Sequence, residues 1–306
     1  MNRTVVKCAV LAGLAIVAIL PTRLCAAPAK MRVGTYNIRC ISKSDQGERS
    51  WNDRRKDFFA HLRKLDMDVF GLQEVTAGQY KEIEKEFSDY AMVGRFREAK
   101  DFTGEAVPVC YRKSRFDLEK SGTFWLSETP DVPGSKSWDT GCTRICTWTL
   151  LKDMKTGKTF CFTNAHTDHK SELARKNGML LIAKRMREFA PEGTPVVFIG
   201  DHNCTETSEP AKAISAILKD ALHISETPPS GSWRSYAGWK YADSELTITE
   251  ALKLPPAKRE KKGCRIDYIY VSDGIKVKSY STLNDPRPGT RLYPSDHFPV
   301  VADIEL

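Results

Sequence analysis

The chain has 306 residues, of which 41% are hydrophobic and 28% are charged. These proportions are ordinary for a globular protein and exclude collagen, a coiled coil, a multispan membrane protein and wholesale disorder. The formal net charge is +8, from 47 basic and 39 acidic residues. This surplus indicates a mild preference for anionic partners and falls well short of a dedicated DNA-binding balance.

Residues 1–29 have the pattern of a cleaved secretory signal peptide. A short basic start is followed by an apolar run from Cys8 to Leu20 and by the small-residue site Ala27-Pro28-Ala29. The run is shorter than the roughly 20 residues of a membrane span, so no stable span is expected. We expect cleavage after Ala29, with Ala26 as the alternative because Pro28 is unfavourable after the cut. The mature protein is then secreted or periplasmic.

The mature chain, residues 30–306, is expected to form one domain. The leader carries Arg3, Lys7 and Arg23 and no acid, so its removal lowers the net charge from +8 to +5. The remaining length suits two domains of about 150 residues or one large α/β structure. The sequence contains no internal repeat and no long linker, and nothing in it points to an obligate protein partner.

Strand-like and helix-like segments alternate along this domain. In chain order we expect strands at 31–38, 69–74, 106–111, 160–165, 195–200, 265–271 and 298–304, and helices at 51–65 and 171–189. The first helix has Phe58, Leu62 and Leu65 on one face, and the second has Leu173, Leu180, Ile182 and Met186 as its apolar positions. Segments 228–238 and 253–263 are predicted to be surface insertions. Alternating strands and helices favour a single α/β domain.

The cysteines give a weaker signal. Seven follow the leader: Cys40, Cys110, Cys142, Cys146, Cys161, Cys204 and Cys264. An odd number leaves at least one free thiol, and several of the seven lie in apolar strands, where cysteine behaves as a small hydrophobe. We expect mostly buried thiols with one or two disulfides, and no structural zinc site.

Polar residues collect at the ends of the predicted strands. They are Asn37, Glu74, His166, Asp168, Asp201, Asn203, Asp267, Asp296 and His297. Each alone is explained as a turn residue or a helix cap, but the whole set is harder to explain that way. Carboxylate and amide oxygens with two imidazoles, and no activated serine or cysteine, are typical of a site for a hard metal ion such as Mg²⁺, with Mn²⁺ as the alternative.

The sequence resembles the endonuclease/exonuclease/phosphatase superfamily, which includes deoxyribonuclease I. The matching segments, in the family's order, are Thr35–Arg39, Gly71–Val75, Val109–Lys113, Asn164–His169, Gly200–Asn203, Arg265–Ile269 and Ser295–Val300. Gly122–Pro130 is similar to the secreted bacterial branch, itself similar to the carbon-catabolite-repression deadenylases. The resemblance implies a four-layer α/β sandwich of two mixed β-sheets flanked by helices.

The resemblance also implies a metal site and a base. Glu74 would be the principal metal carboxylate, and Asn37 and Asp296 would complete the metal and phosphate site. His297 would pair with Asp267, which fixes the ring tautomer and raises its basicity.

The remaining roles concern the water and the phosphate. Asp201 would orient or deprotonate the attacking water, and Asn203 would hold a phosphoryl oxygen. His166 and Tyr111 would donate hydrogen bonds to the phosphate, and Asp168 would support His166 or the nearby loop.

Other positions keep two interpretations. His202 lies where the family usually has an aromatic or aliphatic residue, and a local packing variant is the cautious interpretation. His169 belongs either to the surroundings of the site or to a loop contact. Trp51 and Arg54 favour a helix anchored by a buried indole. Of the tryptophans, Trp233 and Trp239 are the better candidates for a wall of the substrate site.

The function expected from these features is metal-dependent phosphoester hydrolysis by water attack on phosphorus. A nuclease or phosphodiesterase acting on RNA or DNA is the first hypothesis. The alternative is a phosphatase or phospholipase-like esterase acting on a sugar, inositol or sphingolipid phosphate. An inactive binding module on the same scaffold is the third.

Overall fold

The computed structural model describes residues 29–306, so residues 1–28 of the predicted signal peptide, 1–29, lie outside the described residues. Ala29 is fully buried, and its carbonyl accepts a hydrogen bond from the Leu306 amide, 3.1 Å. The folded part therefore already includes Ala29, one residue before the predicted boundary, and cleavage at the alternative site after Ala26 would retain this contact. None of the helices within residues 29–306 is long and apolar enough to cross a membrane.

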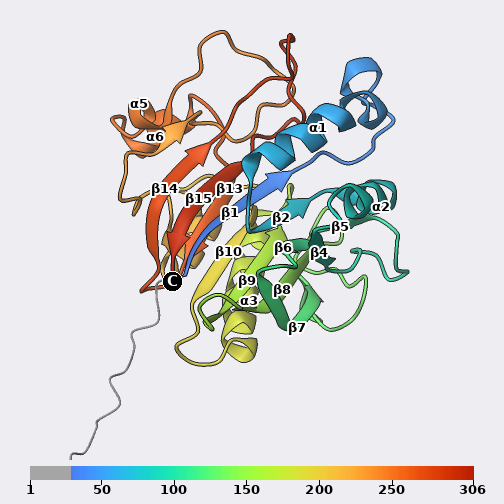
Figure 1. Cartoon of the computed structure of the whole chain (residues 1–306), viewed down its shortest axis with the longest axis vertical. Helices are drawn as coiled ribbons and strands as arrows, with labels where there is room; N and C mark the ends of the chain where they lie inside the picture. Colours follow the sequence, from blue (N-terminus) through green and yellow to red (C-terminus); the bar gives the residue numbers. More distant parts are fainter. Residues whose placement is uncertain (1–28) are drawn as a thin grey trace, which may run out of the picture.

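Two large sheets form the centre of the protein (Figure 1). The first has the strand order β12-β14-β15-β1-β2-β6-β4. Its strands are β1 (Lys30–Asn37), β2 (Val69–Gln73), β4 (Tyr90–Val93), β6 (Val109–Arg112), β12 (Ser230–Gly231), β14 (Lys276–Thr282) and β15 (Val300–Glu305). β1 is parallel to β2 and antiparallel to β15, so the first and last strands of the described residues lie side by side.

The second sheet has the order β11-β13-β10-β9-β8-β7. Its strands are β7 (Phe116–Trp125), β8 (Ile145–Asp153), β9 (Thr159–His166), β10 (Val196–Asp201), β11 (Lys219–Asp220) and β13 (Asp267–Val271). β10 is parallel to β9 and antiparallel to β13, so this sheet is also mixed. A small third sheet pairs β3 (Val75–Thr76) with β5 (Glu105–Ala106).

Helices lie around both sheets. They are η1 (Gly47–Arg49), α1 (Trp51–Leu65), α2 (Ala77–Glu86), α3 (Glu172–Phe189), α4 (Glu209–Ser215), α5 (Ile248–Ala251) and α6 (Pro256–Glu260). α1 and α2 pack on the first sheet, and α3 and α4 on the second. The predicted four-layer α/β sandwich is confirmed.

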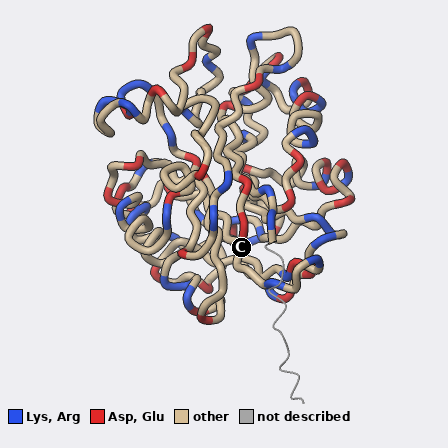
Figure 2. The backbone as a smooth tube through the Cα atoms, turned by 60° about the vertical axis from the view of Figure 1, so that its left-hand side comes forward, with Lys and Arg blue, Asp and Glu red and all other residues tan. Residues whose placement is uncertain are grey.

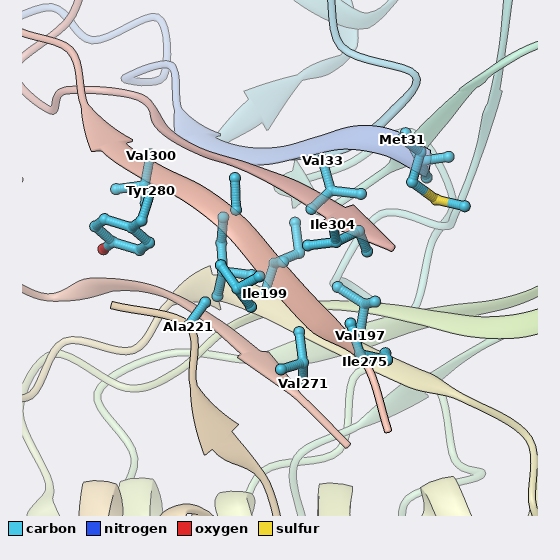
Figure 3. Packing of buried hydrophobic residues seen from close by; sticks show 14 of the residues in the cluster. Met31, Val33, Val197, Ile199, Ala221, Val271, Ile275, Tyr280, Val300 and Ile304 are labelled. Carbon is cyan, nitrogen blue, oxygen red and sulfur yellow. The ribbon is translucent and has the colours of Figure 1, made fainter. Parts of the chain in front are cut away.

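Three hydrophobic clusters fill the spaces between these layers. Figure 3 shows the largest, between the two sheets, where Met31 and Val33 of β1 face Val197 and Ile199 of β10. The second cluster joins α1 to the first sheet through Phe58, Leu62 and Leu65, as predicted. In the third, Ile182 and Met186 of α3 contact the second sheet.

Several predictions about the elements need correction. Leu173 and Leu180 are exposed because they lie on the solvent side of α3, although they fit its apolar spacing. Segment 228–238 is not a surface insertion, because β12 joins the first sheet and Trp233 is buried in the core between the sheets. All seven cysteines in the described part are free thiols, so the expected disulfides do not form.

Candidate active site

The strand period explains where the polar side chains gather. In a strand every second residue faces the same side of the sheet. On the inter-sheet face of β10, Val197 and Ile199 lie in the apolar core and Asp201 is next in the same row of side chains. β1 continues in the same way from Val33 towards Asn37. The inter-sheet space thus changes from apolar to polar at one end of the sandwich.

Strand register brings three of the predicted residues into one row. Asp201 of β10 is the paired neighbour of His166 on β9 and of Asp267 on β13. All three are almost fully buried. The antiparallel pairing of β13 matters here, because it places the first residue of that strand beside the last residue of β10.

Asp201 is the centre of the polar cluster. Its Oδ2 accepts a hydrogen bond from Asn37 Nδ2 at 2.9 Å, and it lies 3.4 Å from His166 Nε2 and 3.7 Å from His297 Nε2. Burial, followed by the nearby negative charge of Asp267, raises the pKa of Asp201 to about 7. A carboxylate with a pKa near neutrality is suited to accept a proton from water.

His297 and Asp267 form a buried acid–imidazole pair. His297 Nδ1 lies 2.9 Å from Asp267 Oδ2, so Nε2 faces the cleft. Burial opposes protonation of this ring, but the charges of Asp267 and Asp201 outweigh it and raise the pKa of His297 to about 10. The predicted pair is confirmed in its geometry, and the ring is a cation at neutral pH.

Glu74 and Asn37 lie on the first sheet's side of the cluster. Glu74 Oε1 accepts from Asn37 Nδ2 at 3.0 Å, and its Oε2 accepts from the Cys40 amide at 3.0 Å. Burial alone would raise the pKa of Glu74, but these hydrogen bonds lower it overall. Glu74 also has a left-handed backbone, with φ of 62°. Such strain in a residue other than glycine is common at functional sites.

Asp296 adds a further carboxylate to the cleft. Its pKa is raised, first by burial and then by the charge of Glu74. Ser295 holds the adjacent backbone in place by donating to the Asn37 carbonyl at 2.7 Å. Four acids therefore converge on this cluster: Glu74, Asp201, Asp267 and Asp296.

This donor set fits a divalent cation. Buried carboxylates that raise one another's pKa values are relieved by a bound positive charge, and carboxylate oxygens are the ligands that hard cations prefer. Asp201, Asp267 and His297 each place one donor atom within 4.8 Å of the others. His297 Nδ1 is hydrogen-bonded to Asp267, so we interpret these three residues as the acid–imidazole pair with Asp201 beside it and not as a set of metal ligands. Glu74 and Asp296, for which the resemblance implies a metal-binding role, line the same cleft.

His166 and Asn203 form the wall opposite Glu74. Asn203 Nδ2 donates to His166 Nε2 at 3.0 Å and to the Thr167 carbonyl at 3.1 Å. Burial, and then the charge of Arg144, lower the pKa of His166 well below its usual value. His166 is therefore a neutral ring, and its Nδ1 has no partner within the described residues.

The cluster opens into a cleft of about 520 Å³. Its lining includes predicted residues and others that were not predicted. The unpredicted ones are Arg39, Cys40, Arg97, Glu105, Cys142, Arg144, Tyr236 and Ile266. Tyr236 is half-exposed, and its ring centre lies 5.0 Å from that of His297. An aromatic residue of segment 228–238 was expected at the cleft, but the one that lies there is Tyr236 and not the predicted Trp233.

Two predicted site residues lie elsewhere. Tyr111 pairs with Val69, which in turn pairs with Val33, four residues before Asn37 on β1. Four residues of strand span about 13 Å, and Tyr111 packs in the inter-sheet core, so its predicted role as a phosphate donor is wrong. Asp168 accepts from the Gly141 amide and Thr140 Oγ1 and therefore holds the neighbouring loop, the second of its two predicted roles.

The remaining alternatives are also decided by contacts. His202 stacks on Phe198 with ring centres 4.7 Å apart, so it is a packing variant. His169 lines the cleft and lies 3.2 Å from Arg144 through Nδ1. Trp51 is buried and anchors α1 as expected. Trp233 is in the core, so the predicted substrate wall is wrong for this residue.

Comparison with known proteins identifies relatives of the same fold. A Bacteroides thetaiotaomicron mannosyl-6-phosphatase structure is 30% identical, with a TM-score of 0.78, and the match covers 90% of this chain and 99% of that one. A Bacteroides vulgatus endonuclease/exonuclease/phosphatase structure is 31% identical, with a TM-score of 0.79 and coverage of 91% and 99%.

Curated relatives are more distant. Human tyrosyl-DNA phosphodiesterase 2 is 23% identical over 89% of this chain and 67% of its own length. Drosophila melanogaster Nocturnin is 23% identical over 93% of this chain, which spans about half of that protein (48%). The family model described as "Endonuclease/Exonuclease/phosphatase family" matches residues 34–297. The chain therefore belongs to the endonuclease/exonuclease/phosphatase family, whose members are hydrolases acting on phosphoesters.

Proposed function

We propose that this protein is a metal-dependent phosphomonoesterase that releases phosphate from a small sugar phosphate. The observation that carries the proposal is the convergence of four acids, a neutral His166 and a charged His297 at the base of a cleft of about 520 Å³. This volume lies within the usual range for small-molecule sites. Arg97, Glu105 and His169 on the walls supply the hydrogen-bonding groups that a polyhydroxylated leaving group requires.

Water attack on phosphorus follows from the arrangement around Asp201. As the new O–P bond forms, Asp201 accepts the proton of the water, and the P–O bond to the sugar breaks on the opposite side. The released sugar oxygen takes a proton from solvent, so the products are the alcohol and inorganic phosphate. His297, held by Asp267, stabilises the charge on the phosphoryl oxygens. Asn203 does not hold one of them as predicted, because both hydrogens of its amide are donated to His166 and to the Thr167 carbonyl, and it orients His166 instead.

Glu74 and Asp296 would hold Mg²⁺, or Mn²⁺ in its place, with Asn37 positioning the Glu74 carboxylate. A hard cation there neutralises the phosphate dianion and so reduces its repulsion of the incoming water. Asn37 positions both Glu74 and Asp201, because its amide nitrogen donates a hydrogen bond to each carboxylate. We propose Mg²⁺ as the metal ion and Mn²⁺ as its alternative.

The substrate class is supported by the 30% identical mannosyl-6-phosphatase, which the chain matches over nearly its full length. Nucleic acid is the second candidate, favoured by the net charge and by the similarity to tyrosyl-DNA phosphodiesterase 2. Figure 2 shows basic and acidic residues interspersed along the whole described backbone. We also propose that the protein acts outside the cytoplasm, on the strength of residues 1–29.

A substrate panel with Mg²⁺ or Mn²⁺ tests the function. Hexose 6-phosphates, a nitrophenyl phosphate, RNA and DNA are assayed with the wild type and with His297→Ala. We expect turnover of hexose phosphates with little salt dependence, and loss of that turnover in the variant. Cleavage of RNA or DNA that falls steeply with salt would favour the nuclease instead, because backbone contacts release counterions. Equal activity of the two proteins would contradict the site assignment.

A further inference from the structure

Arg144 differs from the other buried arginines of the described chain. Four arginines are buried: Arg54, Arg144, Arg259 and Arg265. Arg259 pairs with Glu206 and Arg265 with Asp220. Arg54 has no carboxylate partner, but its guanidinium donates to four backbone carbonyls. Three of the four are therefore well provided with acceptors.

Arg144 lacks such partners, although it is only 7% exposed. Within residues 29–306 its one side-chain hydrogen bond joins its guanidinium to His169 Nδ1 at 3.2 Å, and no carboxylate lies within ion-pair distance. Its buried Nε has no acceptor. Burying a charge without a partner is unfavourable unless another charge compensates it. A guanidinium left in this condition is ready to bind an anion from outside the chain.

The position of Arg144 places that unused charge in the cleft. It directly precedes β8 and lines the cleft together with His166, Asp201 and His297. Neighbouring arginines are already neutralised: Arg39 pairs with Asp45 at 2.7 Å, and Arg97 with Glu105 at 2.7 Å. Among the arginines that line the cleft in the described chain, Arg144 is therefore the one without a carboxylate partner.

We propose that Arg144 is the anion-binding residue of a substrate subsite beside the hydrolytic cluster, where its guanidinium holds an anionic oxygen group of the substrate. His169 orients the guanidinium by accepting one of its hydrogens, and the Arg97–Glu105 pair forms the adjacent wall. The group held is either the phosphoryl group that is cleaved or a second phosphate or carboxylate on the same substrate. The inference rests on the proposed function for the identity of the ligand as substrate.

Binding of inorganic phosphate tests the subsite without turnover. The wild type, Arg144→Met and Arg144→Lys are titrated calorimetrically with phosphate in the presence of Mg²⁺, and Arg185→Met on the outer helix α3 is the matched control. We expect phosphate affinity to fall about tenfold or more in Arg144→Met, to recover partly in Arg144→Lys and to stay unchanged in the control. Equal affinity in wild type and Arg144→Met, or no phosphate binding by the wild type, would overturn the proposal.

Thermal unfolding separates binding from a structural role. Arg144→Met removes an unpartnered buried charge, so its unfolding midpoint should equal or exceed that of the wild type. A lower midpoint with unchanged phosphate affinity would show that Arg144 serves only the fold.

Kinetics identify the group that is held. Loss of kcat/KM in Arg144→Met with every phosphomonoester indicates the cleaved phosphoryl group. Loss confined to substrates with a second phosphate or a carboxylate indicates that second group. If the wild type hydrolyses no phosphoester but Arg144→Met still loses phosphate affinity, the proposed function fails and the subsite stands. If the wild type is active and Arg144→Met behaves identically, the subsite fails alone.

Discussion

Two buried imidazoles at the end of β10 lie on opposite faces of the same sheet. On the inter-sheet face, His297 contacts Asp267 and lies near Asp201, and its pKa is raised to about 10. On the outer face, His202 stacks on Phe198, Tyr268 and Tyr270, and burial lowers its pKa to about 3. Both rings are almost fully buried, so burial alone does not decide their charge.

The side chains that contact each ring decide whether it is charged. Burial disfavours the charged form of both rings, and only nearby carboxylates reverse that preference. The sheet separates the two environments: a strand with period two gives acids to one face and aromatic rings to the other. The same two strands, β10 and β13, thus build an electrostatic centre on one side and a packing surface on the other.

Asp201→Asn should give the largest effect on the inter-sheet face. Removing the proposed base, while keeping an acceptor for Asn37, should lower kcat by about 10³-fold, within the range of general-base catalysis. Steady-state kinetics at saturating metal measure this. Tyr268→Phe on the outer face is the control and should keep most of the activity. A comparable loss in both variants would mean that the two faces are not functionally distinct.

Asp267→Asn should move the titration of His297. Loss of the carboxylate removes the strongest contribution that raises its pKa, so that pKa should fall by about 1–3 units. If protonated His297 is required, the alkaline limb of the activity profile shifts to lower pH by the same amount. NMR titration of the ring in the metal-free protein checks the direction. An unchanged pKa would assign its elevation to Asp201 instead.

Glu74→Gln should weaken the metal requirement selectively. One carboxylate charge is lost, and the single amide oxygen of Gln can accept from only one of the two donors, Asn37 Nδ2 or the Cys40 amide. We expect the Mg²⁺ concentration for half-maximal activity to rise about 10–100-fold. Titration of activity with Mg²⁺ measures it, with Glu82→Gln on the surface helix α2 as the control. A lower kcat at an unchanged metal requirement would remove Glu74 from the metal site.

His202→Phe should improve stability in acid. The folded pKa of about 3 lies below the usual 6.5, so between these values only the unfolded chain takes up the proton. Stability from this residue is therefore complete above pH 6.5 and is lost as the pH falls towards 3. The loss at pH 5 is about 2 kcal/mol, at 1.36 kcal/mol per pH unit.

Denaturant unfolding at pH 8 and pH 5 measures the His202 effect. The free energy of unfolding of the variant, relative to that of the wild type, should be higher at pH 5 than at pH 8. The change in packing affects both pH values equally and cancels in this comparison. An equal difference at pH 8 and pH 5 would show that His202 does not titrate on unfolding.

The sequence by itself determined the alternation of strands and helices and the row of polar strand ends. Its ordered motifs, through the family resemblance, also predicted that Asp201, Asp267 and His297 belong to one site. These features are local, because an apolar strand followed by acids has the same meaning in any α/β protein. One domain over residues 30–306 stays a prediction, and the approach of Asn37 and His297 to the same carboxylate, Asp201, agrees with it.

Tertiary structure decided the rest, because those features depend on register and on partners distant in sequence. Tyr111 has the right residue type and motif, yet strand pairing places it in the row of Val33, in the apolar core. Tyr236 comes from a segment that resembles a loop, and it is placed at the cleft by its pairing with Cys264 and His297. In the sequence, nothing distinguishes Arg144 from the other basic residues. The structure distinguishes it, because its guanidinium is buried and has no carboxylate partner within the described chain.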